Sequence, residues 1–413
     1  MRKAIMLRTL ILLVSLLLVL IVGCQQQPAQ HEAPTPQPAP SPPPVPTTAA
    51  PPPSPASFAV ISLNIEPTEV MTGDMVTVTA EIENTGGSNG TYTATLTLDG
   101  AEMATEDVAT APGTNETVTF SFFKDVTGIY RVKLAHLSSA LIVKSPEGLP
   151  SGYIVEKDSY YTDDQIEILD ITYMSDGLRI KGYMALPKAP GKYPAVIWNR
   201  GGNREFSLLK PEALKIYAQN GFVAIGSQYR GNGGGEGNEE FGGDDVNDVI
   251  NLIPTLKSLS IVDADRIGMV GYSRGGMMTY LALKEQTLGG TNDIKVACTV
   301  GGAADLFMAA DERVEMLRGV LVPLIGGSPS KVPQEYEARS ATYWADKINV
   351  PLLIQHGEAD ENVSVEQSRK LAQELDKYGK VYKLITYPNG DHPLSTHKGG
   401  RPEILRWLRQ YLK

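Results

Sequence analysis

The stretch Asp265-Arg266-Ile267-Gly268-Met269-Val270-Gly271-Tyr272-Ser273-Arg274-Gly275-Gly276 joins two kinds of apolar pattern. Ile267 to Val270 is a short apolar run typical of a buried parallel strand, and the residues after Gly276 repeat apolar side chains at helical spacing. The G-x-S-x-G pentapeptide between them predicts a sharp strand-to-helix turn, in which two glycines bracket Ser273 because larger side chains would collide. Such a turn exposes the serine hydroxyl as a candidate nucleophile and aims the first N–H groups of the helix at a developing oxyanion. A glycine-rich turn without chemistry is the alternative for the pentapeptide alone, so the surrounding sequence has to decide.

Length, charge and cysteine content narrow the possibilities. A chain of 413 residues with 42% hydrophobic residues is long enough for about two to three domains, each with its own core. The formal net charge of −10 argues against nucleic acid or an anionic lipid surface as the partner. The two cysteines, Cys24 and Cys298, lack C-x-x-C spacing, which argues against a thiolate zinc site and a disulfide framework. We expect no metal and no cofactor. Cys298, inside the apolar run from Ile294 to Val300, is predicted to be a buried strand residue.

Residues 1–23 have a basic start followed by an apolar run from Leu10 to Val22. The run is 13 residues long, which fits the core of a signal peptide and falls short of the roughly 20 residues of a membrane-spanning helix. It ends in Ile21-Val22-Gly23-Cys24, which resembles the lipobox of bacterial lipoproteins. The resemblance implies that residues 1–23 are a lipoprotein signal peptide and that Cys24 becomes the acylated first residue of a protein anchored in the bacterial cell envelope, outside the cytoplasm. An ordinary secretory peptide with an incidental cysteine is the alternative.

Residues 24–56 form a proline-rich segment, with 13 of the chain's 29 prolines between Pro28 and Pro55. Proline lacks the N–H donor that helices and sheets require, so the composition predicts a disordered, extended tether. A plain stalk is favoured over a P-x-x-P ligand for a partner domain.

Residues 57–145 alternate apolar and polar side chains with period two, as in Val76 to Ile82 and Tyr92 to Leu98. Further strands are predicted at 117–122 and 128–134, and short strands at regular spacing favour a β-sandwich. The E-x-E-N-T-G-G turn ending at Gly87, the following Leu-Asp-Gly and the late Gly-Ile-Tyr-Arg-Val resemble the CARDB and related immunoglobulin-like modules of bacterial surface proteins. His136, in this module, is interpreted as a surface or half-buried strand residue.

From residue 150 to 413, strand patterns alternate with helical ones, which predicts an α/β fold with a doubly wound sheet. Strands are predicted near 166–173, 178–186, 195–198, 223–228, 267–270, 296–300, 352–355 and 382–387. Helices are predicted near 210–220, 244–259, 275–285, 365–378 and 403–412. Eight strands in this arrangement match the α/β-hydrolase fold, and residues 311–348, which break the alternation, are expected to form a helical insertion over the strand ends.

The base that would activate Ser273 has to come from the chain's five histidines. In α/β-hydrolases the order along the chain is Ser, then Asp or Glu, then His. Two histidines lie before the predicted catalytic domain, which leaves His356, His392 and His397.

Two stretches resemble prolyl-oligopeptidase-like serine peptidases of the S9 type. His356-Gly357-Glu358-Ala359-Asp360-Glu361-Asn362-Val363 is similar to their H-G-x-x-D-x-x-V segment, whose Asp is the acid of the triad. Tyr387-Pro388-Asn389-Gly390-Asp391-His392 is similar to their closing Y-P-x-x-x-H. The resemblance implies Asp360 as the acid and His392 as the base, with His397 as the fallback. His356 is interpreted as packing at the strand end.

The same resemblance implies an oxyanion hole made by the N–H of Arg274 and one N–H from the loop after the third predicted strand. That loop reads Asn199-Arg200-Gly201-Gly202, where the family usually has His-Gly-Gly or Tyr-Gly-Gly. The departure leaves Gly201 and Gly202 as alternatives for the second donor. Gln228-Tyr229-Arg230-Gly231-Asn232-Gly233-Gly234 and Val262-Asp263-Ala264-Asp265-Arg266-Ile267 resemble two further family segments, Y-R-G-S-x-G-x-G and V-D-x-x-R-I.

Other acidic residues are weaker candidates. Asp305 is an alternative acid, but its position favours a helix N-cap. An acidic cluster offers a cation or amine site, although a solvated loop with helix-starting acids is the simpler interpretation. The cluster consists of Glu236, Glu239, Glu240, Asp244, Asp245 and Asp248.

Three functions follow from these patterns. The first is an exported, lipid-anchored serine hydrolase that cleaves short peptides through an acyl-enzyme. The second keeps the triad but acts on small carboxylic esters. The third is a surface binding protein in which the sandwich is the working part and the hydrolase fold is degenerate.

Overall fold

The structure is a computed structural model that describes residues 52–145, 148–392, 394 and 400–413. The predicted signal peptide, Cys24, almost all of the proline-rich segment, and His397 lie outside the described residues. Among the residues that are described, no helix is both long enough and apolar enough to cross a membrane.

The N-terminal folded part consists of two sheets, one with the order β1-β3-β6 and one with the order β2-β8-β7-β4-β5. Their strands pair antiparallel, except that β2 pairs with β8 in parallel. The strands are β1 (Phe58–Glu66), β2 (Glu69–Met71), β3 (Met75–Asn84), β4 (Gly90–Leu98), β5 (Ala101–Thr110), β6 (Asn115–Phe123), β7 (Gly128–Leu134) and β8 (Leu137–Lys144). Alternate residues of β3 and β4 are buried in one core, which confirms the predicted sandwich. The unpredicted strands have weaker patterns: β5 is mostly exposed, and β1 contains a register shift. His136 lies in the exposed turn between β7 and β8 and not in a strand.

The C-terminal part is built on a nine-stranded sheet with the order β17-β16-β15-β14-β12-β13-β11-β10-β9. Its strands are β9 (Ile154–Thr162), β10 (Ile166–Ser175), β11 (Leu178–Pro187), β12 (Tyr193–Asn199), β13 (Val223–Ser227), β14 (Val262–Tyr272), β15 (Ile294–Val300), β16 (Leu352–Gly357) and β17 (Tyr382–Tyr387). All eight predicted strands are present, and β12 to β17 pair in parallel. The ninth, β9, is an edge strand whose side chains are mostly exposed, so it has no apolar run to reveal it.

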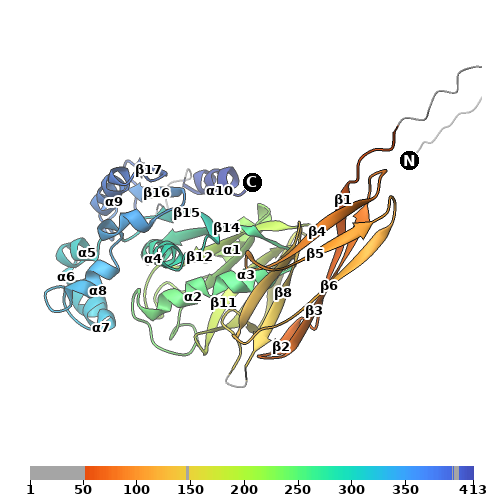
Figure 1. The fold of residues 1–413 in the computed structure, drawn as a ribbon. Helices are drawn as coiled ribbons and strands as arrows, with labels where there is room; N and C mark the ends of the chain where they lie inside the picture. Colours follow the sequence, from red (N-terminus) through yellow and green to blue (C-terminus); the bar gives the residue numbers. More distant parts are fainter. Residues whose placement is uncertain (1–51, 146–147, 393, 395–399) are drawn as a thin grey trace, which may run out of the picture. The chain divides into compact units, whose positions relative to one another are not determined.

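Helices cover both faces of this sheet, as Figure 1 shows for the segment from green to blue. On one face, α1 (Glu212–Gln219) and α10 (Gly400–Tyr411) bury side chains in one core. On the other face lie α2 (Asn247–Ile250), α3 (Leu252–Ser258), α4 (Arg274–Leu288) and α9 (Val365–Lys377), which share a second core. The fold is therefore a doubly wound α/β-hydrolase sheet, in which the carboxyl ends of the parallel strands meet at one edge. Cys298 is fully buried in β15, as predicted.

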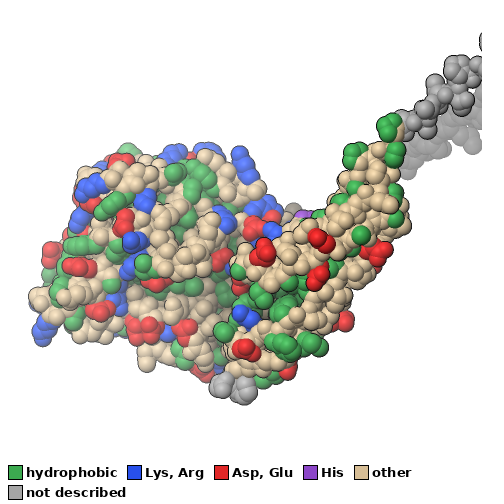
Figure 2. All heavy atoms as spheres, in the orientation of Figure 1, with side chains coloured by type: hydrophobic (Ala, Val, Ile, Leu, Met, Phe, Trp, Pro, Cys, Tyr) green, Lys and Arg blue, Asp and Glu red, His purple; other side chains and the backbone are tan. Residues whose placement is uncertain are grey.

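The segment after β15 is helical, as expected for an insertion. It contains α5 (Leu306–Glu312), α6 (Val314–Met316), a π-helical turn at Leu317–Leu321, α7 (Val322–Ile325) and α8 (Pro333–Ala338). Figure 2 shows Lys and Arg interspersed with Asp and Glu over the visible face of the C-terminal part. That face therefore carries no continuous basic patch of the kind that binds nucleic acid.

Candidate active site

Ser273 occupies the turn between β14 and α4. Its backbone has φ 56° and ψ −124°, a strained combination for a residue with a side chain. A Cβ on Gly271 would lie 2.0 Å from the carbonyl oxygen of Gly275, and a Cβ on Gly275 would lie 2.0 Å from that of Asn199. Only glycine fits at either position, so the predicted strand-to-helix turn is present for the steric reason expected.

Asp360 follows β16 and is held on both carboxylate oxygens. Its Oδ1 accepts hydrogen bonds from the N–H groups of Asn362 and Val363 at 2.8 and 2.9 Å, and its Oδ2 accepts one from His392 Nδ1 at 2.7 Å. Burial acts to raise the pKa of Asp360, but hydrogen bonds from His356, His392 and Val363 outweigh it and hold that pKa well below the ordinary value. The carboxylate is therefore ionised throughout the neutral pH range, and it fixes Nδ1 of His392 as the protonated ring nitrogen.

Ser273 and His392 line the same cavity, whose volume is about 1150 Å³. Aromatic side chains from several elements contribute to its wall: Trp198, Phe206, Tyr217, Phe241 and Tyr272. Within the described residues, no hydrogen bond joins Ser273 Oγ to the His392 ring. The structure thus brings Ser273, His392 and Asp360 to one end of the sheet, where Ser273 and His392 line one cavity and Asp360 contacts His392.

His356 does more than pack at the end of its strand. It is fully buried, and its Nε2 lies 2.8 Å from the carbonyl oxygen of Val363 and 3.3 Å from Asp360 Oδ2. Its Nδ1 lies 2.6 Å from Ser368 Oγ. A carbonyl can only accept, so Nε2 carries the proton and Nδ1 accepts from the serine hydroxyl. His356 therefore supports the loop that presents Asp360, a role that its place four residues earlier in the motif did not reveal.

The loop after β12 passes directly beside Ser273. A Cβ on Gly201 would lie 3.1 Å from Ser273 Cβ and 3.7 Å from Ser273 Oγ, whereas the Cβ position of Gly202 faces Phe206. Arg200 is fully buried, and its guanidinium donates to the carbonyls of Gly201, Arg204, Phe206 and Ser207 at 3.1–3.5 Å. Arg200, which departs from the family pattern, thus holds the loop together through hydrogen bonds to the loop's own carbonyl oxygens.

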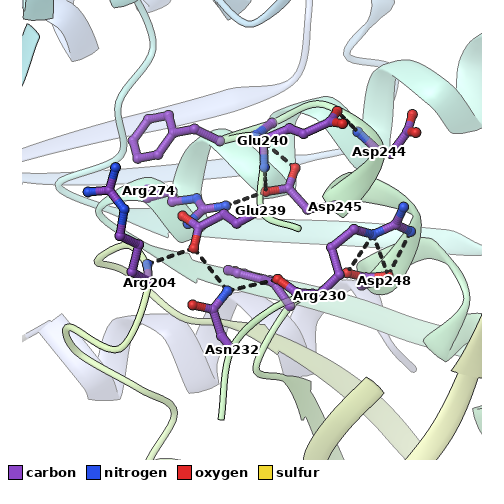
Figure 3. A network of polar contacts seen from close by, with 12 residues as sticks. Arg204, Arg230, Asn232, Glu239, Glu240, Asp244, Asp245, Asp248 and Arg274 are labelled. Atoms are coloured by element: carbon purple, nitrogen blue, oxygen red, sulfur yellow. Dashed lines mark hydrogen bonds and ion pairs between the residues drawn. The ribbon is translucent and has the colours of Figure 1, made fainter. Parts of the chain in front are cut away.

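Asp244, Asp245 and Asp248 lie in the first turns of helical segments, as predicted, but the prediction that the acidic segment is solvated is wrong for three of its members. The side chains of Glu239, Asp245 and Asp248 are 4%, 0% and 0% exposed. Glu239 and Asp245 form ion pairs with Arg274, and Asp248 pairs with Arg230 (Figure 3). The sequence shows the acids but not the cations, because the arginines belong to other segments of the chain.

The remaining members of the cluster are Glu236, Glu240 and Asp244, and the carboxylates of the two glutamates accept backbone N–H groups. No group of three or more His, Cys, Asp or Glu side chains in the described ranges is arranged to hold a metal ion. Asp305, the alternative acid, is the N-cap of α5 and accepts from the N–H groups of Phe307 and Met308.

Comparisons with known proteins agree with this architecture. The model of the prolyl oligopeptidase family matches residues 209–413, and the CARDB model matches residues 57–147. The uncharacterized peptidase YtmA of Bacillus subtilis (strain 168) is 37% identical over 261 residues, which are 63% of this chain and 99% of that protein. Dipeptidyl-peptidase 5 of Porphyromonas endodontalis is 25% identical over 248 residues, 56% of this chain and 35% of that protein.

Solved structures show the same fold at low identity. An acylaminoacyl peptidase bound to Z-Gly-Gly-Phe-chloromethyl ketone aligns with a TM-score of 0.50 and 17% identity, over 86% of this chain and 55% of that one. The rice cell wall degrading esterase LipA of Xanthomonas oryzae aligns with a TM-score of 0.51 and 13% identity, over 63% and 98% of the two chains. Because YtmA is matched over nearly its whole length, the chain belongs to the prolyl oligopeptidase family of serine hydrolases and carries a CARDB domain ahead of its α/β-hydrolase domain.

Proposed function

We propose that this protein is an exported serine peptidase that hydrolyses short peptides, with Ser273 as nucleophile, His392 as general base and Asp360 as the acid that orients it. The observation that carries the proposal is the 2.7 Å hydrogen bond between His392 Nδ1 and Asp360 Oδ2 at the cavity that Ser273 also lines. Nucleophile, base and orienting carboxylate in this relation are what acyl transfer requires.

The reaction runs in two halves. Ser273 Oγ attacks the carbonyl carbon of the scissile bond while His392 Nε2 takes its proton, and that proton then passes to the leaving amine as the acyl-enzyme forms. Water attacks the ester in the second half, with His392 again acting as base. Asp360 stays ionised and stabilises the imidazolium. Because no hydrogen bond joins Ser273 and His392 among the described residues, their contact has to close when the substrate binds.

Two N–H groups would stabilise the tetrahedral oxyanion. One belongs to Arg274, the first residue of α4, and Gly201 is the better candidate for the second because its Cβ position lies 3.1 Å from Ser273 Cβ. Gly202 remains the alternative. Loss of one such donor lowers turnover by roughly 10² to 10³.

The cavity supports a substrate larger than a simple ester. Its volume of about 1150 Å³ exceeds the roughly 300–1,000 Å³ of pockets that hold drug-sized ligands. Besides the aromatic side chains, Met316 and Val320 of the helical insertion line it. A wall of this kind suits apolar side chains on either side of a peptide bond.

A fluorophosphonate probe tests the nucleophile. We expect wild-type protein to be labelled and Ser273→Ala to remain unlabelled with the same unfolding midpoint in urea. A folded wild-type protein that takes up no label would contradict the proposal and favour a surface binding protein with an idle hydrolase fold.

Matched substrates test the leaving group. Hydrolysis of peptidyl amides with a kcat/KM comparable to that of a p-nitrophenyl ester supports the peptidase. Hydrolysis of the ester with no measurable cleavage of aminoacyl or peptidyl amides would instead make the protein a carboxylesterase with the same triad.

The N-terminal sequence supports anchoring through a lipid on Cys24, with the folded part outside the cytoplasm at the cell envelope. The proline-rich residues 24–56 would then separate the catalytic domain from the membrane.

A further inference from the structure

Glu239 connects the start of α4 with the loop after β12, the two segments that would supply the oxyanion N–H donors. Its side chain is 4% exposed and lies in the loop between β13 and α2. Oε1 forms an ion pair with Arg274 Nη1, and Oε2 accepts the backbone N–H of Arg204 at 2.6 Å (Figure 3). Arg274 follows the nucleophile, and Arg204 belongs to the loop that contains Gly201 and Gly202. One carboxylate therefore links the two sources of oxyanion N–H donors.

The Arg274 end of this link is rigid. The side chain is 2% exposed, and its guanidinium lies between the rings of Tyr229 and Phe241, at 4.9 and 4.7 Å from their centroids. Asp245 pairs with Nη2, and Nη1 also donates to the carbonyl oxygen of Gly202 at 3.3 Å. A buried side chain that is held at both Nη atoms and packed against two rings couples its position to its own backbone N–H.

The loop end of the link is held from two directions. Arg200 holds the loop carbonyls from inside, as described above. Glu239 holds the Arg204 N–H from the other side, and its Oε2 also accepts Asn232 Nδ2 at 2.9 Å. Arg200 by itself fixes the shape of the loop. The loop is also tied to α4 at its base, where Asn199 Nδ2 donates to Thr279 Oγ1 at 2.9 Å, whereas Glu239 and Arg274 tie its Gly202–Arg204 part to the first residue of α4.

We propose that Glu239 is a positioning residue that sets the spacing between the two N–H donors of the oxyanion hole. Oxyanion stabilisation depends on donors placed where charge develops, and a displacement of about 1 Å can lower turnover by roughly 10². The proposal rests on the proposed function, because it assigns a role in the same reaction.

Two substitutions distinguish the effect of the Glu239 charge from the effect of its side-chain length. Glu239→Gln removes the negative charge opposite Arg274 and turns an amide donor toward groups that are themselves donors. Glu239→Asp keeps the charge but is one methylene shorter, so it cannot contact both Arg274 and Arg204. Glu240→Gln is the matched control, because Glu240 is adjacent in sequence and, among the residues that the structure describes, its carboxylate accepts a hydrogen bond from the exposed N–H of Asp244 alone.

Two kinds of measurement provide the test. Steady-state kinetics are measured on a p-nitrophenyl ester and on the best peptide substrate. Binding affinity is measured for a peptidyl boronic acid and for the carboxylic acid product. For both Glu239 variants we expect kcat to fall about tenfold to a hundredfold, with KM and product affinity within about twofold of wild type. The boronic acid should lose affinity by about the same factor as kcat/KM, because it imitates the tetrahedral intermediate. Glu240→Gln should match wild type in all four measurements.

The outcomes are distinct. Equal loss of boronic acid and product affinity, or full recovery of kcat by Glu239→Asp, would overturn the positioning role and leave the proposed function intact. Wild-type kcat in Glu239→Gln would do the same. A purely structural role would lower the free energy of unfolding without changing kcat per folded molecule. A folded wild-type protein without turnover on any of these substrates overturns both proposals together.

Discussion

Gly301 lies directly beside the Asp360–His392 pair. It follows β15, between β14 and β16 in the sheet, and its φ is +55°. A Cβ there would lie 3.1 Å from both Asp360 Oδ2 and His392 Nδ1. Glycine is thus favoured here for two reasons. It adopts the left-handed backbone conformation without strain, and it leaves room for the hydrogen bond between Asp360 and His392.

Gly301→Ala should therefore lower activity more than stability. We expect a loss of about 1 kcal/mol in the free energy of unfolding from the left-handed backbone, and at least a tenfold loss of kcat from displacement of the pair. Gly290→Ala is the control, because Gly290 has φ +67° and its Cβ would meet nothing within 4 Å. It should lose similar stability in urea unfolding and keep wild-type kcat. Equal activity of the two variants would show that the pair tolerates the methyl group.

Two carboxylates of the short helical segment from Asp244 to Ile250, three residues apart, form ion pairs with two arginines near the active site. Asp245 pairs with Arg274, and Asp248 pairs with Arg230 through hydrogen bonds of 2.9–3.2 Å. A separation of three residues places both side chains on one face of a helical turn. Each carboxylate fixes a different segment, the start of α4 and the loop after β13.

Asp248→Asn should be strongly destabilising for this reason. The substitution leaves the buried Arg230 without its main partner, and breaking a buried ion pair in this way typically costs about 3–5 kcal/mol. Asp244→Asn, four residues earlier and exposed, should change the free energy of unfolding by less than about 0.5 kcal/mol. Urea unfolding of both variants checks the difference, and a loss below about 1 kcal/mol for Asp248→Asn would contradict it.

The residues proposed for lipid anchoring and those proposed for catalysis lie in different parts of the chain. The lipobox-like segment and the proline-rich residues precede the sandwich, and the proposed catalytic and oxyanion-hole residues all follow residue 200. In the proposed function, anchoring and catalysis depend on different parts of the molecule, so they should respond independently to substitution.

Cys24→Ser should abolish incorporation of a tagged fatty acid in the cell and leave kcat of the purified protein unchanged. The thiol is the acceptor of the lipid in the proposal, whereas the catalytic groups lie more than a hundred residues away in sequence. Ser273→Ala should show the converse, full lipid incorporation without turnover. Fatty-acid labelling of Cys24→Ser at the wild-type level would exclude Cys24 as the site of acylation.

The local features of the fold could be predicted because they depend on neighbours in sequence. Period-two burial in β3, apolar runs in the parallel strands and the two glycines around Ser273 follow from side-chain geometry within a few residues. Edge strands such as β9 escaped because an exposed strand needs no apolar pattern.

The amino-acid sequence by itself determined the turn at Ser273, the order of strands and helices along the chain, and three chemically suitable residues at 273, 360 and 392. Only the tertiary structure decided which side chains meet: Asp360 contacts His392 while Asp305 caps a helix, His356 supports the acid, and Glu239 links Arg274 to the loop after β12. These contacts join segments far apart in sequence, and they exist because the sheet places β12, β14, β15 and β16 side by side. Strand adjacency is a property of the packed core, which no single segment encodes.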